Sequence, residues 1–478
     1  MPGVIIKTST KAGPTNAVGA PTSRAFIAGI TERGRLTPFS VRSVVEYEQE
    51  FGGLTSYAGH MYRAAQTFFE EGGAELVVCR AVGNTPTLAT ASLVDRTPTT
   101  PLQTMRLDAA NPGAWGGNLT YQVTAGSVAN SVNLAIFLNG ARVSYITNKT
   151  TVADLVTALS TDPYVRATNL GAASVGVTNL PAVTGPTALT GGNDDRATVT
   201  AAKVAAALDG AGLSYGAGAV AAPGYNASTI GALLIAHAKT NRRVAILAGD
   251  VTSQPSDLTT MAAALTTDGQ YAGLFGPWVS VPDGSGTANV SPEGYVLGVR
   301  ARAMNSVGFW QAAAGGRAAA RYVVGTVATW DNSVINALAD GRVSGITRKG
   351  TDTVLYGWRS LTTNTDQFQL LSSQDVMNTL TFLVEQTLEP YVFETVDGSG
   401  QLVSRVKGAL VGLLQPIEDA GGFTARYDAD GNVVNPAYKV VVSVLNETTL
   451  SCTVAVRLSG VAETIEVSLI KAAYNATI

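Results

Sequence analysis

The feature that most constrains the fold is an alternation of two patterns within residues 219–304. Short apolar runs, typical of buried strands, alternate with stretches whose apolar residues recur every three or four positions, as on one face of a helix. The runs are 219–222, 244–248 and 274–279, and the helical stretches are 228–239, 258–266 and 291–304. Because parallel strands need a long crossover, this alternation predicts a mainly parallel sheet covered by helices.

The same α/β core is expected to include an earlier part of the chain. Residues 24–30 and 74–82 are apolar and strand-like. Between them, Ser43 and Glu46 form a capping-box pattern that opens a helix ending at Phe51-Gly52-Gly53, and a second helix is expected over 58–71. A hairpin-like pair is expected at 341–347 and 353–358. We therefore assign residues 23–102 and 196–358 to this core.

Residues 103–195 have a different character and predict an inserted β-rich domain. Strand-like runs at 119–124, 132–138 and 142–146 are separated by Gly, Asn and Ser clusters, and one short helix is expected near 152–159. Asn139-Gly140 between two of these runs predicts a tight hairpin. Residues 85–100 are expected to be an irregular Thr- and Pro-rich connector.

The two ends of the chain predict an assembly domain with terminal arms. Residues 359–478 contain two amphipathic helices, one capped by Ser372 with Asp375 and one over 401–417. Three alternating strands, 438–445, 451–459 and 464–470, follow, and residues 460–478 form a C-terminal arm. Residues 1–22 are an N-terminal arm and linker, whose short strand at 1–8 has no neighbour in sequence and must pair with a distant segment or another molecule.

The charge content excludes some function classes. Lys plus Arg number 32 and Asp plus Glu 35, so the net charge of −3 creates no general attraction for nucleic acid or anionic membrane. Charged residues are 14% of the chain, against about 25% in ordinary globular proteins. So few charges suit a subunit that covers much of its surface with copies of itself. We predict no direct nucleic-acid binding.

Membrane insertion and disulfides are also not expected. No run of 18 apolar residues exists, although mean hydropathy is +0.18, and the N-terminal residues lack the pattern of a signal peptide. Cys79 and Cys452 each lie in an apolar strand-like run. They are predicted to be buried free thiols in a protein made in a reducing cytoplasm.

The residues needed for most catalysis are missing. His60 and His237 are the 2 histidines, and each lies in an expected helix. No His-Glu-x-x-His, Cys-x-x-Cys or Gly-Lys sequence occurs, no nucleophile elbow of the Gly-x-Ser-x-Gly type is expected, and Gly210-x-Gly212 lacks the third glycine of a dinucleotide loop. Residues 428–432 resemble half a calcium loop, but an Asp-Gly turn explains them better. We predict no enzyme, no cofactor and no metal.

An enzyme with an unrecognised site stays open as the least favoured alternative. The best place for such a site is the loop at 223–226, which contains no acid, base or nucleophile.

Several segments resemble, in order, the contractile tail sheath proteins of bacteriophages and related contractile injection systems. The most specific match is Phe68-Phe69-x-x-Gly72-Gly73-Ala74-x-x-x-Val78-x-Arg80. The segment at 112–118 resembles the entry to the family's inserted domain, and 308–314 matches a motif that usually continues with Pro but does not here. Further matches are Pro2-Gly3-Val4, 24–29, 51–53, 277–279, 291–299 and 358–361.

The resemblance implies a subtilisin-like fold without a catalytic triad and a structural role. Such subunits polymerise as stacked six-fold rings around a tail tube and contract to drive the tube through a bacterial envelope, without nucleotide hydrolysis. Implied partners are copies of the chain itself, the tail tube protein, and baseplate and tail terminator proteins. The implied location is a virion tail sheath assembled in the bacterial host cytoplasm, with the inserted domain facing outward. A sheath subunit of a bacterial injection system that is not part of a virion is the alternative.

Three groups of candidate site residues follow. The arms are expected to donate strands to neighbouring subunits through Val4, Ile5, Ile6, Lys7 and Thr8, and through Ile465, Glu466, Val467, Ser468, Leu469 and Ile470. The expected strand acceptors are Val440, Val442, Val444, Val454 and Val456. Arg405 and Lys407 are candidates for tube attachment, because they are the only charges of their helix before Glu418; ordinary solvated charges on a core helix are the equal alternative.

Overall fold

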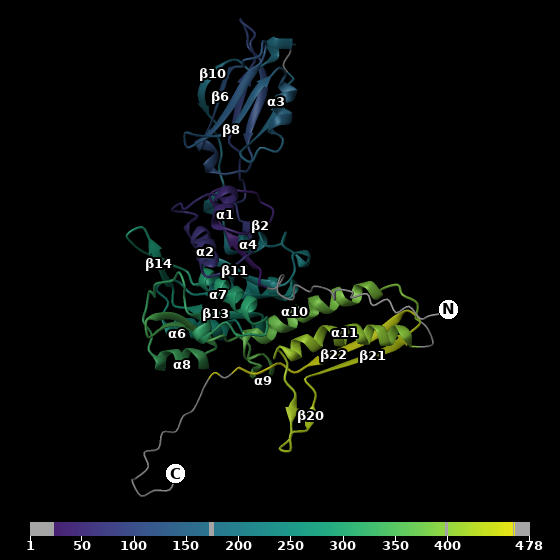
Figure 1. Ribbon diagram of the computed structural model, residues 1–478. Coiled ribbons are helices and arrows are strands. Elements are labelled where there is room, and N and C mark those ends of the chain that lie inside the picture. Colours follow the sequence, from purple (N-terminus) through teal and green to yellow (C-terminus); the bar gives the residue numbers. More distant parts are fainter. Residues whose placement is uncertain (1–22, 172–175, 397–399, 462, 464–478) are drawn as a thin grey trace, which may run out of the picture. The chain divides into compact units, whose positions relative to one another are not determined.

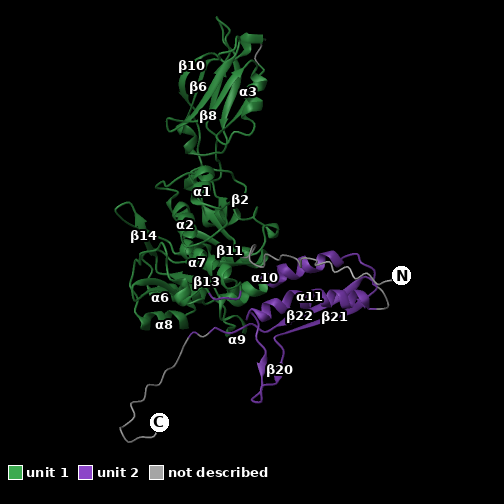
Figure 2. Cartoon of the chain, in the orientation of Figure 1, with its two compact units in different colours: residues 1–309, 313–378 green, residues 310–312, 379–478 purple. Residues whose placement is uncertain are grey.

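The computed structural model describes residues 23–171, 176–396, 400–461 and 463. By its internal contacts the chain divides into two compact units, shown in Figure 2. Unit 1 contains residues up to 309 together with 313–378, and unit 2 contains 310–312 and 379–478. The strands expected at 1–8 and 464–470 lie outside the described residues.

The centre of unit 1 is an eight-stranded sheet, in which the alternation of 219–304 appears as strands and helices (Figure 1). Its six inner strands are parallel, and the short edge strands β2 and β18 are antiparallel to their neighbours. In sheet order the strands are β18 (Asp352–Tyr356), β17 (Val343–Lys349), β13 (Ala272–Gly276), β12 (Arg243–Ala248), β11 (Gly218–Asn226), β1 (Ala25–Gly29), β3 (Leu76–Arg80) and β2 (Phe39–Val41). The expected mainly parallel sheet is therefore present.

Both faces of this sheet are buried, as the continuous apolar strands require. Alternate residues such as Phe26, Val220 and Leu247 join a core with side chains of α4, α5, α6 and α8. The residues between them are also buried, and α2 and α7 pack on each other and on β11. The helices of unit 1 outside the insert are α1 (Val44–Phe51), α2 (Gly59–Glu70), α4 (Ala201–Ala206), α5 (Ala227–Thr240), α6 (Pro255–Ala264), α7 (Glu293–Ser306), α8 (Asn332–Asp340), α9 (Thr365–Phe368) and the start of α10 (Leu371–Leu388).

Local sequence signals set several element ends. The Ser43 side chain accepts a hydrogen bond from the backbone N–H of Glu46 at the start of α1, as predicted, and Gly52 ends the helix with φ +87°. The run expected as one strand at 274–279 instead divides between β13 and β14 (Val279–Asp283), which forms a small sheet with β15 (Gly286–Val290) and β16 (Gly325–Thr326). Pro277 lies in this break, where it donates no ladder hydrogen bond.

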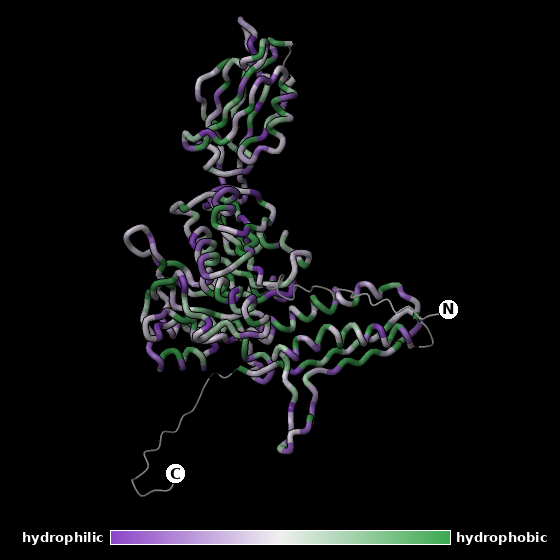
Figure 3. The backbone as a smooth tube through the Cα atoms, viewed as in Figure 1, coloured by the Kyte–Doolittle hydropathy of each residue, from purple (hydrophilic) through white to green (hydrophobic). Residues whose placement is uncertain are grey.

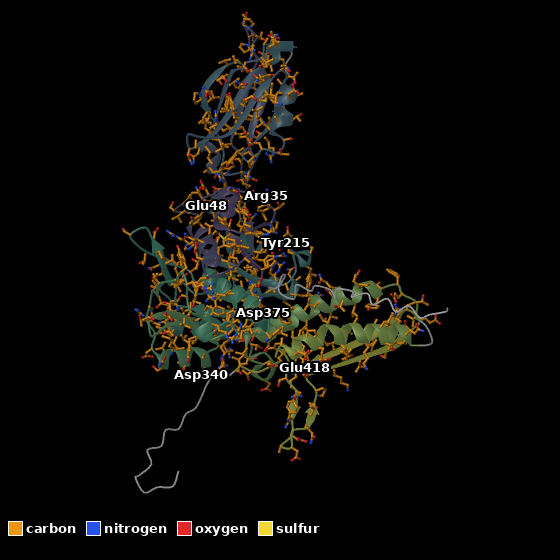
Figure 4. The ribbon with its side chains drawn as sticks, viewed as in Figure 1. Arg35, Glu48, Tyr215, Asp340, Asp375 and Glu418 are labelled. Atoms are coloured by element: carbon orange, nitrogen blue, oxygen red, sulfur yellow. The ribbon has the colours of Figure 1, made fainter. Side chains whose placement is uncertain are left out.

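The prediction that Ser372 caps the N-terminus of α10 is wrong. The helix begins at Leu371, and Ser372 and Asp375 are buried within it. The Asp375 carboxylate accepts two hydrogen bonds from Arg300 of α7, at 2.9 Å from Nε and 2.7 Å from Nη2. Figure 4 labels Asp375. The sequence pattern gave no sign of Arg300, which lies 75 residues away.

The insert forms two antiparallel sheets and one helix around a core of its own. One sheet has the order β4 (Thr90–Val94), β5 (Gln103–Ala109), β9 (Val165–Asn169), and the other β10 (Thr184–Ala188), β6 (Leu119–Ala125), β7 (Val132–Leu138), β8 (Ala141–Lys149); the helix is α3 (Val152–Leu159). Asn139 and Gly140 turn with φ +51° and +81°, as the hairpin prediction requires. The insert's core begins at Ala89, because β4 lies in the supposed connector 85–100.

The cysteines are free, as predicted. Cys79 is buried, and burial raises the pKa of its thiol to about 12, whereas Cys452 is only half-buried. Helices that combine the length and apolarity needed to cross a bilayer are absent from the part of the chain that the structure describes.

A buried acid at the start of α7 is expected to make the folding stability of unit 1 depend on pH. Glu293 is 1% exposed, and its Oε2 has no hydrogen-bond partner. Burial raises the pKa of Glu293 to about 7, against smaller opposing effects of hydrogen bonds from Ser291 and from the backbone of Glu293 and Gly224. The folded protein therefore keeps this proton at pH values where the unfolded chain has released it.

Replacing Glu293 with Gln should remove a pH dependence of stability. With a pKa of about 7 when folded and 4.5 ordinarily, the stabilisation is complete below pH 4.5 and is lost as pH rises through 7, by about 3 kcal/mol in total. Denaturant unfolding at pH 5 and pH 8 should show a smaller loss for E293Q than for the parent. The exposed Glu70→Gln serves as control, and an unchanged pH dependence in E293Q would contradict the assignment.

Candidate assembly surface

Unit 2 contains a two-stranded antiparallel ribbon with open edges. β21 (Tyr438–Asn446) pairs with β22 (Thr449–Val456), and the five expected acceptor residues all lie in these two strands. Val440 is opposite Val454, and Tyr438 is opposite Val456. Described residues form no further strand beside this ribbon; a single bridge, Phe423 to Leu458, lies just beyond β22.

One face of the ribbon packs on α11 (Gln401–Asp419), which is in contact with β21. The Tyr438 hydroxyl donates to Oε1 of Gln415 at 2.8 Å, and Val440 is 8% exposed. Apolar and polar positions alternate along α11 (Figure 3). Its buried residues recur every three or four positions, as on one face of a helix: Leu402, Val406, Leu410, Leu413, Leu414 and Ile417. The packed face fixes the strands, so their outer backbone edges are held ready for pairing.

The opposite face of the ribbon is open. Val441 is 45% exposed and Leu445 69%. A strand pair that exposes both apolar side chains and unpaired backbone groups is marginal by itself. The expected donor residues of both arms lie outside the described residues, so their pairing stays a prediction.

Arg405 and Lys407 are both exposed on α11, on either side of the buried Val406. Arg405 forms an ion pair with Glu394, which precedes the helix within unit 2. Lys407 has no ion pair with a described residue. The two cations therefore differ: one is already neutralised within its own chain, and the other is available.

A second exposed hairpin precedes β21. β19 (Arg426–Tyr427) pairs with β20 (Val433–Asn435), and the Asp428 carboxylate accepts backbone hydrogen bonds from Asp430 and Asn432. The carboxylate of Asp428 thus closes the turn, as the Asp-Gly interpretation of 428–432 expects. Groups of three or more acidic, His or Cys side chains that could hold a metal ion are not found among the described residues.

Each of the two histidines contacts another side chain of unit 1. His60 in α2 packs edge-on against Trp278, with ring centroids 5.7 Å apart. His237 in α5 accepts from Arg243 Nη1 at 2.8 Å, and burial, with a smaller effect of Arg243, lowers its pKa to about 4. A neutral imidazole that is already hydrogen-bonded to a buried guanidinium is poorly suited to act as a base.

Sequence comparison gives no relative: no family model and no curated protein matches the chain. Solved structures do match over nearly its whole length. The sheath tail protein of Desulfitobacterium hafniense is 13% identical with a TM-score of 0.61, covering 95% of this chain and 99% of that one. The sheath tail protein of Listeria innocua is 14% identical with a TM-score of 0.63, covering 90% and 94%.

An assembled sheath also matches. The sheath of an extracellular contractile injection system, PVC, in its contracted state is 14% identical with a TM-score of 0.56, and the match covers 99% of this chain and 98% of that one. At these identities the likeness concerns the fold. This chain has the fold of the contractile tail sheath proteins.

Proposed function

We propose that this protein is the structural subunit of a contractile sheath that polymerises as stacked six-fold rings around a tail tube. The observation that carries the proposal is the match of 90–99% of the chain to sheath proteins of known structure. The open β21–β22 ribbon supports it, because a polymer needs a surface that only a neighbour can complete. We further propose that the α/β core of unit 1, without the insert, is the family's subtilisin-like domain lacking its triad. The insert would face outward, and the protein would not be an enzyme.

Subunits would be joined by strand addition. The arms at 4–8 and 465–470 would pair with the free edges of β21 and β22 in neighbouring copies, extending two strands to four. Each backbone hydrogen bond contributes about 0.5–1.5 kcal/mol net, so an arm of five or six residues gives a firm but local tether. The linker at 9–22 would let rings move without losing this connection.

Contraction would need no bound nucleotide. The energy would come from the difference between two sets of contacts between subunits, one in the extended sheath and one in the contracted sheath. Tube attachment must then be weak enough to release. Lys407 suits this role, and Arg405 could exchange Glu394 for an acid on the tube at little net cost, because exposed ion pairs contribute only about 0–1 kcal/mol.

We infer a tail sheath of a phage virion, assembled in the host cytoplasm with tube, baseplate and terminator proteins. A bacterial injection system is the alternative, and one observation favours keeping it: the solved structures that match include PVC and the anti-feeding prophage. The genes beside this one would separate the two.

Electron microscopy of the purified full-length protein tests the proposal directly. Long hollow tubes with six-fold symmetry are expected, because sheath subunits contain the contacts for their own polymerisation. A strictly monomeric protein at every concentration and salt condition would count against a sheath and in favour of the enzyme alternative.

Deleting residues 1–20 should abolish tubes and leave a folded monomer, since the described sheets are complete without them. Ile5→Pro with Lys7→Pro is the finer variant, because proline removes the N–H groups that a donated strand needs. Ile5→Ala with Lys7→Ala is the matched control and should still polymerise. Sedimentation and circular dichroism report the two properties, and normal tubes from the deletion would refute strand donation by this arm.

Reversing the charges in Arg405→Glu and Lys407→Glu should prevent growth of the sheath on its tube at physiological salt. Weak ion pairs repeated around each ring add up, so the loss should exceed tenfold in assembled length. Arg142→Glu with Lys203→Glu, in unit 1, is the control. If the double variant of α11 still covers tubes to full length in the extended state, the attachment site lies elsewhere.

A further inference from the structure

The insert is joined to the rest of unit 1 by two chain segments that pair with each other. The backbone N–H of Gly83 donates to the carbonyl of Asp194, and Thr87 and Asn193 exchange backbone hydrogen bonds of 2.7 and 3.0 Å. The Asp195 carboxylate accepts from the backbone N–H groups of Asn84 and Thr85. The connection is thus a hydrogen-bonded ribbon and not two independent linkers.

Arg80, at the end of β3, connects the core to the insert beside this ribbon. Its Nη1 donates to the carbonyl of Gly34 at 2.7 Å, in the loop after β1. Its Nη2 donates to the carbonyl of Pro112 at 2.8 Å, in the insert segment that follows β5. Arg80 is 2% exposed; its hydrogen bond to Gly34 is buried, and its hydrogen bond to Pro112 is partly buried. A planar guanidinium that holds two carbonyls fixes their separation and direction.

Arg33 also connects the core to the insert, by a hydrogen bond to the core and by ring contacts with the insert. Its Nη2 donates to the carbonyl of Glu48 at 2.8 Å, near the C-terminal end of α1 in the core. The same guanidinium lies 5.9 Å from the ring of Trp115 and 5.4 Å from the ring of Tyr164, both in the insert. A cation is favourable both at a helix C-terminus and over aromatic rings.

Gly113 leaves the space that these contacts need. Its φ is +138°, and a Cβ at this position would lie 2.9 Å from the Trp115 ring and 3.0 Å from Arg80 Nη2. The glycine of the segment 112–118 and the arginine that ends the motif at 68–80 are therefore parts of one contact, although about 30 residues separate them.

We propose that Arg33 and Arg80 clamp the insert to the core, so that the insert moves with the core as one body instead of swinging on its connection. The clamp is a property of the single chain and does not depend on the proposed sheath function. In an assembled sheath it would carry the insert rigidly with each subunit. Burial lowers the pKa of Arg80 to about 10, and the nearby Asp194 opposes that shift, so Arg80 remains charged at neutral pH.

Distances between two spin labels test the clamp in the full chain. Cysteines replace two exposed alanines, Ala153 in α3 of the insert and Ala232 in α5 of the core, with Cys452→Ser. Cys79 can stay, because it is buried and has a raised pKa. Labelled protein is diluted with an excess of unlabelled protein, so that pairs between subunits do not contribute. The parent should give one narrow distance distribution.

Arg33→Met with Arg80→Met should at least double the width of that distribution. Arg142→Met is the control, because the Arg142 guanidinium stacks on Tyr145 within the insert itself. If the double variant fails to fold by circular dichroism, the partly exposed Arg33→Met alone and Gly113→Ala take its place, each with a smaller broadening expected. An unchanged width in a folded variant, or a parent distribution as broad as the variant's, would overturn the proposal.

Discussion

The ladder between β1 and its two neighbours is the interaction on which the rest of unit 1 depends. Ala25 pairs with Leu76 on one side and with Ala219 on the other. The second pairing closes a loop of nearly two hundred residues, and it places the N-terminal strands and the later βαβ units in one sheet. Because loop-closure entropy grows only slowly with length, a whole inserted domain can be accommodated in that loop. The insert has its own core and adds no strand to the sheet.

Buried charges then fix the helices on this sheet, and each has partners from distant segments. The Glu71 carboxylate is 0% exposed and accepts from the backbone N–H groups of Arg321, Tyr322 and Val323 at 2.9–3.1 Å, and from Arg302 at 3.2 Å. Arg300 and Asp375 do the same between α7 and α10. Buried ion pairs add little net folding free energy compared with apolar side chains of the same size. A misfolded packing that leaves one of these charges buried without its partner is, however, strongly destabilised. They therefore specify one packing.

The proposed assembly through unit 2 would use backbone edges and not reactive side chains. An enzyme presents reactive groups that are held in place by their surroundings, whereas both histidines of unit 1 contact structural partners: His237 is hydrogen-bonded to Arg243, and His60 packs against Trp278. Unit 2 instead presents a short ribbon with one packed face and two open edges. That arrangement is suited to assembly, since the missing strands can come from a neighbour.

The sequence alone determined what depends on neighbouring residues. The period of apolar residues predicted β11, β12, α5, α6 and α7 of the core. Asn139-Gly140 predicted a hairpin of the insert, and Ser43 predicted the start of α1. The order of the motifs along the chain indicated the sheath fold. Only the tertiary structure decided which distant groups meet. Asp375 looked like a helix cap and is the partner of Arg300, Arg405 looked free and is paired with Glu394, and Arg80 meets Pro112. Local sequence patterns do not predict such contacts, because burial and long-range pairing depend on the tertiary fold of the whole chain.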